Sequence, residues 1–121
     1  MAQKILIIED EQTLARSLKA KMERAGYAVD RKIDGVHGLK HATDKKPDFI
    51  ILDLILPGMG GLEVLNALKS KKETKIIPVL VLSNVDDPKS SDEALNLGAV
   101  NYLIKTQVTL ENILEEIRKH I

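Results

Sequence analysis

Short apolar runs alternate with segments of helical spacing along this chain, and no other feature of the sequence limits its fold as strongly. The apolar runs are rich in isoleucine, valine and leucine. Strands that are apolar throughout, rather than at every second residue, are typical of a parallel sheet that is covered on both faces. We expect five strands, at residues 4–8, 27–32, 49–54, 79–83 and 101–104.

The segments between these runs have the spacing of amphipathic helices. Leu14, Leu18 and Met22 lie four residues apart, and Gly26 follows where a helix over residues 11–25 needs a left-handed cap. We expect the other helices near residues 35–44, 62–68, 94–97 and 110–117, the last with Thr109 as its N-cap. Strict alternation of five strands and five helices predicts an α/β fold, a doubly wound parallel sheet with helices on both faces.

Length, charge and cysteine content narrow the class of protein. With 121 residues and no linker-like stretch, residues 1–121 are expected to form a single domain. Lysine plus arginine (18) balance aspartate plus glutamate (18), so net charge does not favour direct binding of nucleic acid. The chain has no cysteine, and its apolar runs are too short for a signal peptide or a membrane span. We therefore expect a soluble cytoplasmic domain without direct nucleic-acid contact or membrane insertion.

Polar residues stand at the carboxyl ends of the expected strands, where open parallel sheets bind their ligands. Glu9 and Asp10 follow the first strand, Asp53 and Ser83 end the third and fourth, and Lys105 follows the fifth. Two carboxylates about 4 Å apart repel by roughly 4 kcal/mol at an effective dielectric near 20. Mg²⁺ prefers oxygen ligands and would offset this repulsion. The cluster therefore indicates a phosphoryl-transfer site in which an aspartate is the nucleophile.

The order and spacing of these motifs resemble the receiver domain of bacterial and archaeal two-component response regulators, of which the chemotaxis regulator is the minimal single-domain case. The resemblance covers essentially the whole chain. It rests on the stretches ILIIEDE, PDFIILDLILPGMGGLEVL, IIPVLVLS and EALNLGAVNYLIK. It implies a flavodoxin-like five-stranded sheet of order 2-1-3-4-5 with five helices, and a signalling domain rather than an enzyme.

The resemblance also implies a role for each residue of the cluster. Asp53 would accept a phosphoryl group from the phosphohistidine of a histidine kinase or phosphotransfer protein. Mg²⁺ would be bound by Glu9, Asp10, Asp53 and the backbone carbonyl of Ile55, with Asp10 as a direct ligand and Glu9 acting through water. The domain would catalyse its own phosphorylation and slow dephosphorylation.

A conformational switch is the second implication of the resemblance. Ser83 and Lys105 would contact the phosphoryl oxygens, and the ring of Tyr102 would turn inward when Ser83 is drawn to the phosphate. Phosphorylation then shifts a pre-existing equilibrium between two states. The output face would lie within residues 90–121. The kinase, the output protein or missing effector domain, and a phosphorylation-dependent dimer stay open at this point.

Four departures from the family pattern bear on this site. Ser83 replaces the commoner threonine and keeps its hydroxyl, whereas Asn84 replaces a small residue and would narrow access to the phosphoryl group. Ile55 and Val85 are apolar and cannot orient an attacking water, so we predict a long-lived phosphorylated state. Thr106 replaces a proline. Because a cis bond before a non-proline residue costs about 3–4 kcal/mol, the Lys105–Thr106 bond is either trans or strained.

Three other functions could use similar residues. A haloacid-dehalogenase-like phosphatase needs a second aspartate two residues after the nucleophile, where this chain has Ile55. A flavodoxin-like flavin binder needs a hydroxyl-rich phosphate loop and aromatic rings, but this chain has carboxylates there and only Tyr27, Phe49 and Tyr102 as aromatic residues. A receiver-shaped scaffold that no longer takes phosphate would have no use for the acid cluster.

Two further groups of charged residues are expected to be solvated surface. The three histidines, His37, His41 and His120, fall on expected helices. The lysines at positions 69, 71 and 72 are expected to form a solvated helix end that complements the helix dipole.

Overall fold

The computed structural model describes residues 2–121 and contains one parallel sheet of order β2-β1-β3-β4-β5, with helices between the strands. The elements in chain order are β1 (Lys4–Ile8), α1 (Gln12–Arg24), β2 (Ala28–Lys32), α2 (Gly35–Lys45), β3 (Phe49–Leu52), α3 (Gly61–Ser70), β4 (Val79–Ser83), α4 (Pro88–Asn96), β5 (Asn101–Ile104), the 3₁₀ turn η1 (Lys105–Gln107) and α5 (Leu110–Arg118). The strand order and the strict alternation confirm the predicted fold.

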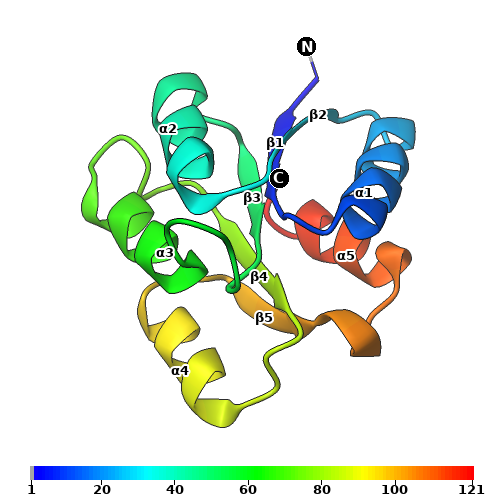
Figure 1. Cartoon of the computed structure of the whole chain (residues 1–121). Helices are drawn as coiled ribbons and strands as arrows, with labels where there is room; N and C mark the ends of the chain where they lie inside the picture. The colour runs from blue at the N-terminus through cyan, green and yellow to red at the C-terminus, as the bar shows by residue number, and fades with distance from the viewer. Residues whose placement is uncertain (1) are drawn as a thin grey trace.

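Helices cover both faces of the sheet, α1 and α5 on one and α2, α3 and α4 on the other (Figure 1). Alternate residues of β1 enter different cores: Leu6 and Ile8 pack toward α2 and α3, whereas Ile5 and Ile7 pack toward α1 and α5. All four side chains are buried. Burial on both faces explains why the central strands are apolar throughout rather than at every second residue.

Element ends differ from the predicted ones where short polar signals set them. β3 ends at Leu52, so Asp53 is the first residue after the strand. α4 begins at Pro88, six residues before the expected start, because the Asp87 side chain accepts a hydrogen bond from the Lys89 amide at 2.8 Å and proline suits the first helical turn. The cap predicted at Thr109 is present, as a reciprocal capping box.

Two glycines allow the loops around the carboxyl edge of the sheet to pack closely. A Cβ at Gly61 would collide with the carbonyl oxygen of Asp53, and one at Gly35 would collide with the carbonyl oxygen of Met59. The β3–α3 loop is thereby held against the starts of α3 and α2. Gly26 adopts the predicted left-handed conformation after α1, with φ of 100°, and Gly98 adopts a similar one after α4, with φ of 109°.

The Lys69 side chain corrects the expectation of a solvated helix end. Its ammonium donates hydrogen bonds to the carbonyls of Lys75 and Ile77 at 3.0 and 2.7 Å, and burial lowers its pKa. Lys69 thus fastens the α3–β4 connection to the end of α3.

None of the helices within residues 2–121 has the length and apolar composition that a membrane-spanning helix requires.

Candidate functional site

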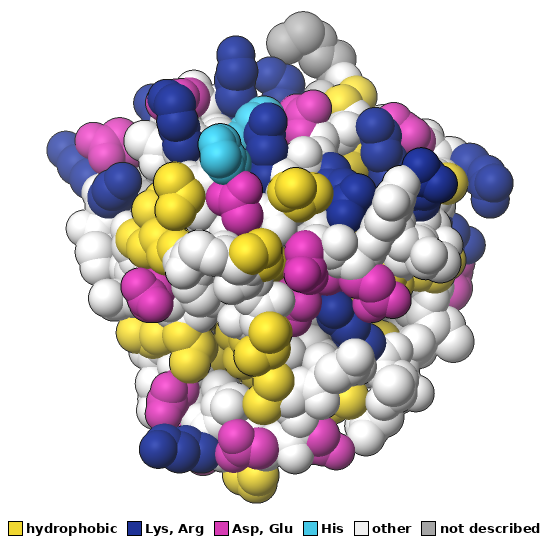
Figure 2. Space-filling view, viewed as in Figure 1, with side chains coloured by type: hydrophobic (Ala, Val, Ile, Leu, Met, Phe, Trp, Pro, Cys, Tyr) yellow, Lys and Arg dark blue, Asp and Glu magenta, His cyan; other side chains and the backbone are white. Residues whose placement is uncertain are grey.

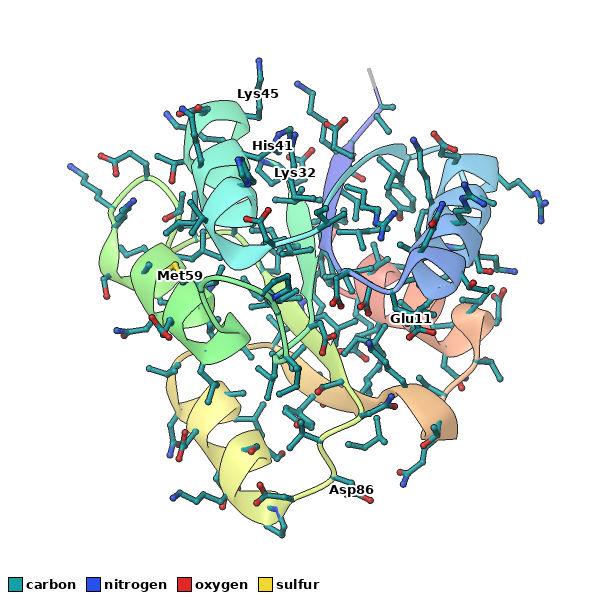
Figure 3. The ribbon with its side chains drawn as sticks, viewed as in Figure 1. Glu11, Lys32, His41, Lys45, Met59 and Asp86 are labelled. Carbon is teal, nitrogen blue, oxygen red and sulfur yellow. The ribbon has the colours of Figure 1, made fainter. Side chains whose placement is uncertain are left out.

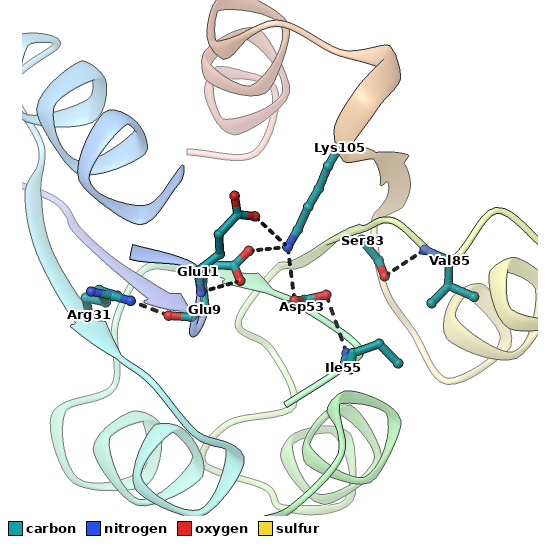
Figure 4. A network of polar contacts seen from close by, with 8 residues as sticks. All are labelled: Glu9, Glu11, Arg31, Asp53, Ile55, Ser83, Val85 and Lys105. Atoms are coloured by element: carbon teal, nitrogen blue, oxygen red, sulfur yellow. Dashed lines mark hydrogen bonds and ion pairs between the residues drawn. The ribbon is translucent and has the colours of Figure 1, made fainter. Parts of the chain in front are cut away.

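Four of the five sheet strands deliver a polar side chain to one edge of the sheet (Figure 4). Glu9 and Asp10 follow β1, Asp53 follows β3, Ser83 ends β4 and Lys105 begins the turn after β5. One carboxylate oxygen from each of the three acids lies within 4.8 Å of the other two. Only 2% of Glu9 and 6% of Asp53 is exposed, whereas Asp10 is open to solvent. The acids predicted to converge therefore form a half-enclosed cluster.

Lys105 supplies the positive charge inside this cluster. Its Nζ lies 2.6 Å from Oε1 of Glu9, 3.0 Å from Oδ2 of Asp53 and 3.8 Å from Oε1 of Glu11. Glu11, the first residue of the predicted first helix, is the residue before α1 and also forms the outer edge of this ion network. One ammonium is thus shared by three carboxylates.

Backbone contacts hold the two buried acids in position. Glu9 accepts a hydrogen bond from the Glu11 amide at 3.1 Å through Oε2, and its carbonyl accepts one from Nε of Arg31 at 3.0 Å. Asp53 donates its amide to the carbonyl of Ile8 at 3.1 Å, and its Oδ1 accepts from the Ile55 amide at 3.4 Å. The Arg31 contact was missed from sequence, because nothing in its local pattern indicates that β2 reaches the end of β1.

Burial and charge alter the acid–base properties of the cluster. Burial raises the pKa of Glu9 above its ordinary value, and the nearby Asp53 charge acts in the same direction. Burial opposes the charged form of Lys105, but hydrogen bonds to Glu9 and Asp53 outweigh it and raise the pKa of the ammonium. The neighbouring carboxylates thus stabilise the charged form of Lys105, whereas burial is the main cause of the shift at Glu9.

Ser83 and Tyr102 meet at the loop that follows β4. Ser83 is fully buried, and its Oγ accepts a hydrogen bond from the Val85 amide at 3.2 Å. The Tyr102 hydroxyl donates to the carbonyl of the same Val85. Burial raises the pKa of this hydroxyl, while the neighbouring Ser83 hydroxyl lowers it. Both proposed switch residues therefore hold the same peptide segment, one by its N–H group and one by its C=O group.

The positions that depart from the family pattern lie around the mouth of the cluster. The Ile55 side chain is 67% exposed and Asn84 is exposed, whereas Val85 is half-buried. No cis peptide bond occurs in the described chain, so the Lys105–Thr106 bond is trans. Lys105 still reaches the acids, because η1 turns the chain immediately after β5.

Comparison with known sequences decides the family. The model of the family described as "Response regulator receiver domain" matches residues 5–118. This chain belongs to that family. Its similarity to response regulators extends to curated proteins: it is 36% identical over 115 residues, 95% of the chain, to response regulator ArlR of Staphylococcus saprophyticus. It is 38% identical over 105 residues, 87% of the chain, to the alkaline phosphatase synthesis transcriptional regulatory protein PhoP of Bacillus subtilis.

The receiver domain spans about half of these relatives, 50% of ArlR and 43% of PhoP. A solved structure of similar size is the chemotaxis response regulator CheY4 of Vibrio cholerae, with a TM-score of 0.91, 26% identity and full coverage of both chains. The signal receiver domain of a signal transduction histidine kinase from Syntrophus aciditrophicus has a TM-score of 0.88 and 29% identity, covering 98% of this chain and 89% of that one. The chain is therefore a two-component receiver domain, a signalling module and not a metabolic enzyme.

Proposed function

We propose that residues 1–121 act as one receiver domain and that Asp53 accepts a phosphoryl group from a histidine kinase or phosphotransfer protein. A carboxylate oxygen of Asp53 attacks the phosphorus of a phosphohistidine, the new O–P bond forms, and the P–N bond breaks with its electron pair left on the imidazole. The observation that carries this proposal is the position of Asp53. One of its carboxylate oxygens lies within 4.8 Å of the other two acids, and Oδ2 lies 3.0 Å from the Lys105 ammonium, at the carboxyl edge of the sheet.

The donor set of the cluster fits Mg²⁺. Its ligands are carboxylate oxygens, and the described residues place no sulfur or imidazole among them. We propose that Glu9, Asp10, Asp53 and the backbone carbonyl of Ile55 hold the ion, with Asp10 as direct ligand and Glu9 acting through water. When bound, Mg²⁺ neutralises negative charge on the transferring phosphoryl oxygens. Hard oxygen ligands on two buried acids and one exposed acid support this assignment.

Lys105 and Ser83 complete the proposed binding of the phosphoryl group. The Lys105 ammonium already contacts the acceptor carboxylate, so it needs only a small movement to reach a phosphoryl oxygen. Drawing the Ser83 hydroxyl to the same group would end its contact with the Val85 amide. The β4–α4 loop is then free to shift and Tyr102 moves with it, which transmits the signal to α4, β5 and α5.

Intact mass after incubation with acetyl phosphate tests the acceptor. Wild type should gain one phosphoryl group only with Mg²⁺, and Asp53→Asn should gain none. Asp86→Asn is the matched control, since Asp86 is an exposed aspartate beyond the same sheet edge that contacts Gln107 rather than the acid cluster. If folded wild type binds Mg²⁺ but takes no phosphoryl group, the chain acts as an interaction scaffold and the proposal is wrong.

Slow self-catalysed dephosphorylation follows from the residues at the mouth of the cluster. Ile55 and Val85 offer no polar side-chain atom that could orient a water toward the phosphorus. We expect the double variant Ile55→Asn/Val85→Gln to lose label from phosphorylated Asp53 faster than wild type. A wild-type half-life no longer than that of the variant would contradict this reasoning.

A phosphatase acting on outside substrates is not favoured by the site. Such an enzyme needs a second carboxylic acid two residues after the nucleophile as a proton donor. That position holds Ile55, whose side chain is 67% exposed and apolar. A leaving alkoxide would therefore meet no acid there.

A further inference from the structure

Two of the three histidines share one face of α2, far in sequence from the acid cluster. His37 and His41 are four residues apart on this helix, and both line a surface hollow of about 200 Å³ together with Asp44 and the lysines at positions 32, 40 and 45. Figure 3 labels His41 beside Lys32 and Lys45, and Figure 2 shows histidine among lysine and arginine side chains above α2. Residues four apart on a helix have Cβ atoms about 5–6 Å apart, within reach of one chelated ion.

Each of these histidines has a carboxylate at one of its ring nitrogens. Nδ1 of His37 lies 2.7 Å from Oδ2 of Asp34, and Nε2 of His41 lies 3.3 Å from Oδ2 of Asp30. A carboxylate at one nitrogen fixes the proton there and leaves a lone pair on the other nitrogen. Imidazoles that bind metals in proteins almost always have such a partner, which also raises their basicity. Both histidines therefore carry the supporting contact of a metal ligand.

The ligand atoms of this hollow select the kind of ion. The lysines at positions 32, 40 and 45 repel any divalent cation, but Asp44 pairs with Lys40 at 2.8 Å, and Asp34 and Asp30 contact the two histidines. Imidazole nitrogen favours Zn²⁺, Ni²⁺ and Cu²⁺, whereas Mg²⁺ and Ca²⁺ depend on oxygen ligands.

We propose that His37 and His41 form a second metal site, distinct from the acid cluster, that takes a divalent transition-metal ion of the imidazole-preferring class. The two imidazole nitrogens supply the protein ligands, at the usual metal–nitrogen distance of about 2.0–2.1 Å, and water completes the coordination. The two side chains differ in freedom, since that of His37 is 72% exposed and that of His41 is 15% exposed. His41 is therefore the more fixed of the two ligands.

Calorimetric titration with Zn²⁺ tests the site on the full chain, with Mg²⁺ present in excess so that the acid cluster is saturated. Wild type should bind one Zn²⁺. His37→Asn and His41→Asn should each weaken binding at least tenfold. His120→Asn is the matched control, because His120 lies beyond α5, next to Glu116 and Phe49, and should leave Zn²⁺ binding unchanged.

Electron paramagnetic resonance of bound Cu²⁺ counts the nitrogen ligands directly, which distinguishes loss of a ligand from a general loss of fold. Hyperfine structure from two imidazole nitrogens is expected in wild type, and from one nitrogen in a folded single variant. The proposal is overturned if wild type binds no Zn²⁺, if His120→Asn weakens binding as much as the α2 variants do, or if Cu²⁺ shows fewer than two nitrogen ligands. Far-UV circular dichroism of each variant identifies any that failed to fold, in which case His41→Gln replaces His41→Asn.

Discussion

Replacing Lys105 with methionine tests whether this ammonium holds the acid cluster together. Lys105 lies 2.6 Å from Glu9 and 3.0 Å from Asp53, and its side chain is 10% exposed. At these separations each attraction amounts to about 5–6 kcal/mol at an effective dielectric near 20, before the cost of removing the charges from water. Removing one partner of a buried ion pair costs about 3–5 kcal/mol, because the remaining charge is left unpaired. We expect Lys105→Met to lower the free energy of unfolding by about that amount in metal-free buffer.

Magnesium should restore much of this loss, because the ion and the ammonium serve the same carboxylates. A ligand that binds only the folded protein, at a concentration a hundred times its dissociation constant, adds about 2.7 kcal/mol to the free energy of unfolding. Without the competing ammonium, Mg²⁺ should bind Lys105→Met at least tenfold more tightly, which adds about 1.4 kcal/mol more at the same concentration. The variant should therefore gain more stability from Mg²⁺ than wild type does.

Urea unfolding with and without Mg²⁺, followed by circular dichroism, measures both effects. Lys69→Met is the matched control, since Lys69 is also partly buried but donates to backbone carbonyls far from the acids. Its loss of stability should be the same with and without Mg²⁺. Two results would refute the reasoning: a metal-free Lys105→Met variant as stable as wild type, or an equal gain from Mg²⁺ in both proteins.

Three further predictions concern stability. Thr109→Ala removes the hydrogen bond that Oγ1 of Thr109 accepts from the Asn112 amide, and should cost about 1 kcal/mol of unfolding free energy in urea titration. Gly61→Ala forces a Cβ onto the carbonyl of Asp53 and should cost about 1–3 kcal/mol of unfolding free energy. Gly60→Ala should cost less, because its Cβ would meet only a flexible Glu63 oxygen at 3.7 Å. Equal losses of stability in the two variants would contradict the close-approach argument. The Glu116 pKa is lowered despite the opposing effect of burial, because the neighbouring lysine and histidine donate to its carboxylate. The stabilisation from the Glu116 carboxylate is therefore present above pH 4.5 and is lost as pH falls through its lower folded-state pKa. In unfolding titrations over that acid range, the free energy of unfolding should fall less for Glu116→Gln than for wild type.

The fold could be predicted because burial on both faces leaves a strong record in the sequence. β1, β4 and β5 begin and end at the predicted residues, since the apolar run of each ends at or directly before a polar site residue. The start of α4 was missed, because its first six residues carry no apolar spacing and only Asp87 and Pro88 mark the boundary. Local apolar spacing predicts packed helix faces, whereas a solvated first turn is set by its cap.

The convergence of the candidate site residues could be predicted, but their individual contacts could not. Parallel strands bring their carboxyl ends to one edge, so convergence of Glu9, Asp53 and Lys105 follows from topology once the strands are known. Contacts that depend on side-chain direction leave no such record. The reach of Glu11 to Lys105, and the hold of Tyr102 on the Val85 carbonyl, depend on rotamers and loop paths that no sequence period encodes.

Charge balance explains why a folded chain retains an arrangement of this kind. The carboxylates of Glu9, Asp10 and Asp53 lie together with the Lys105 ammonium in a partly buried cluster, so these four groups carry an excess of about two negative charges. A divalent cation cancels that excess, whereas a second lysine would cancel only half of it. Phosphorylation of Asp53 would replace a single negative charge by nearly two, which strengthens the attraction for both the ion and Lys105. If the proposed function holds, the repulsion among these acids is the property that would make the site respond to a metal ion and to a phosphoryl group.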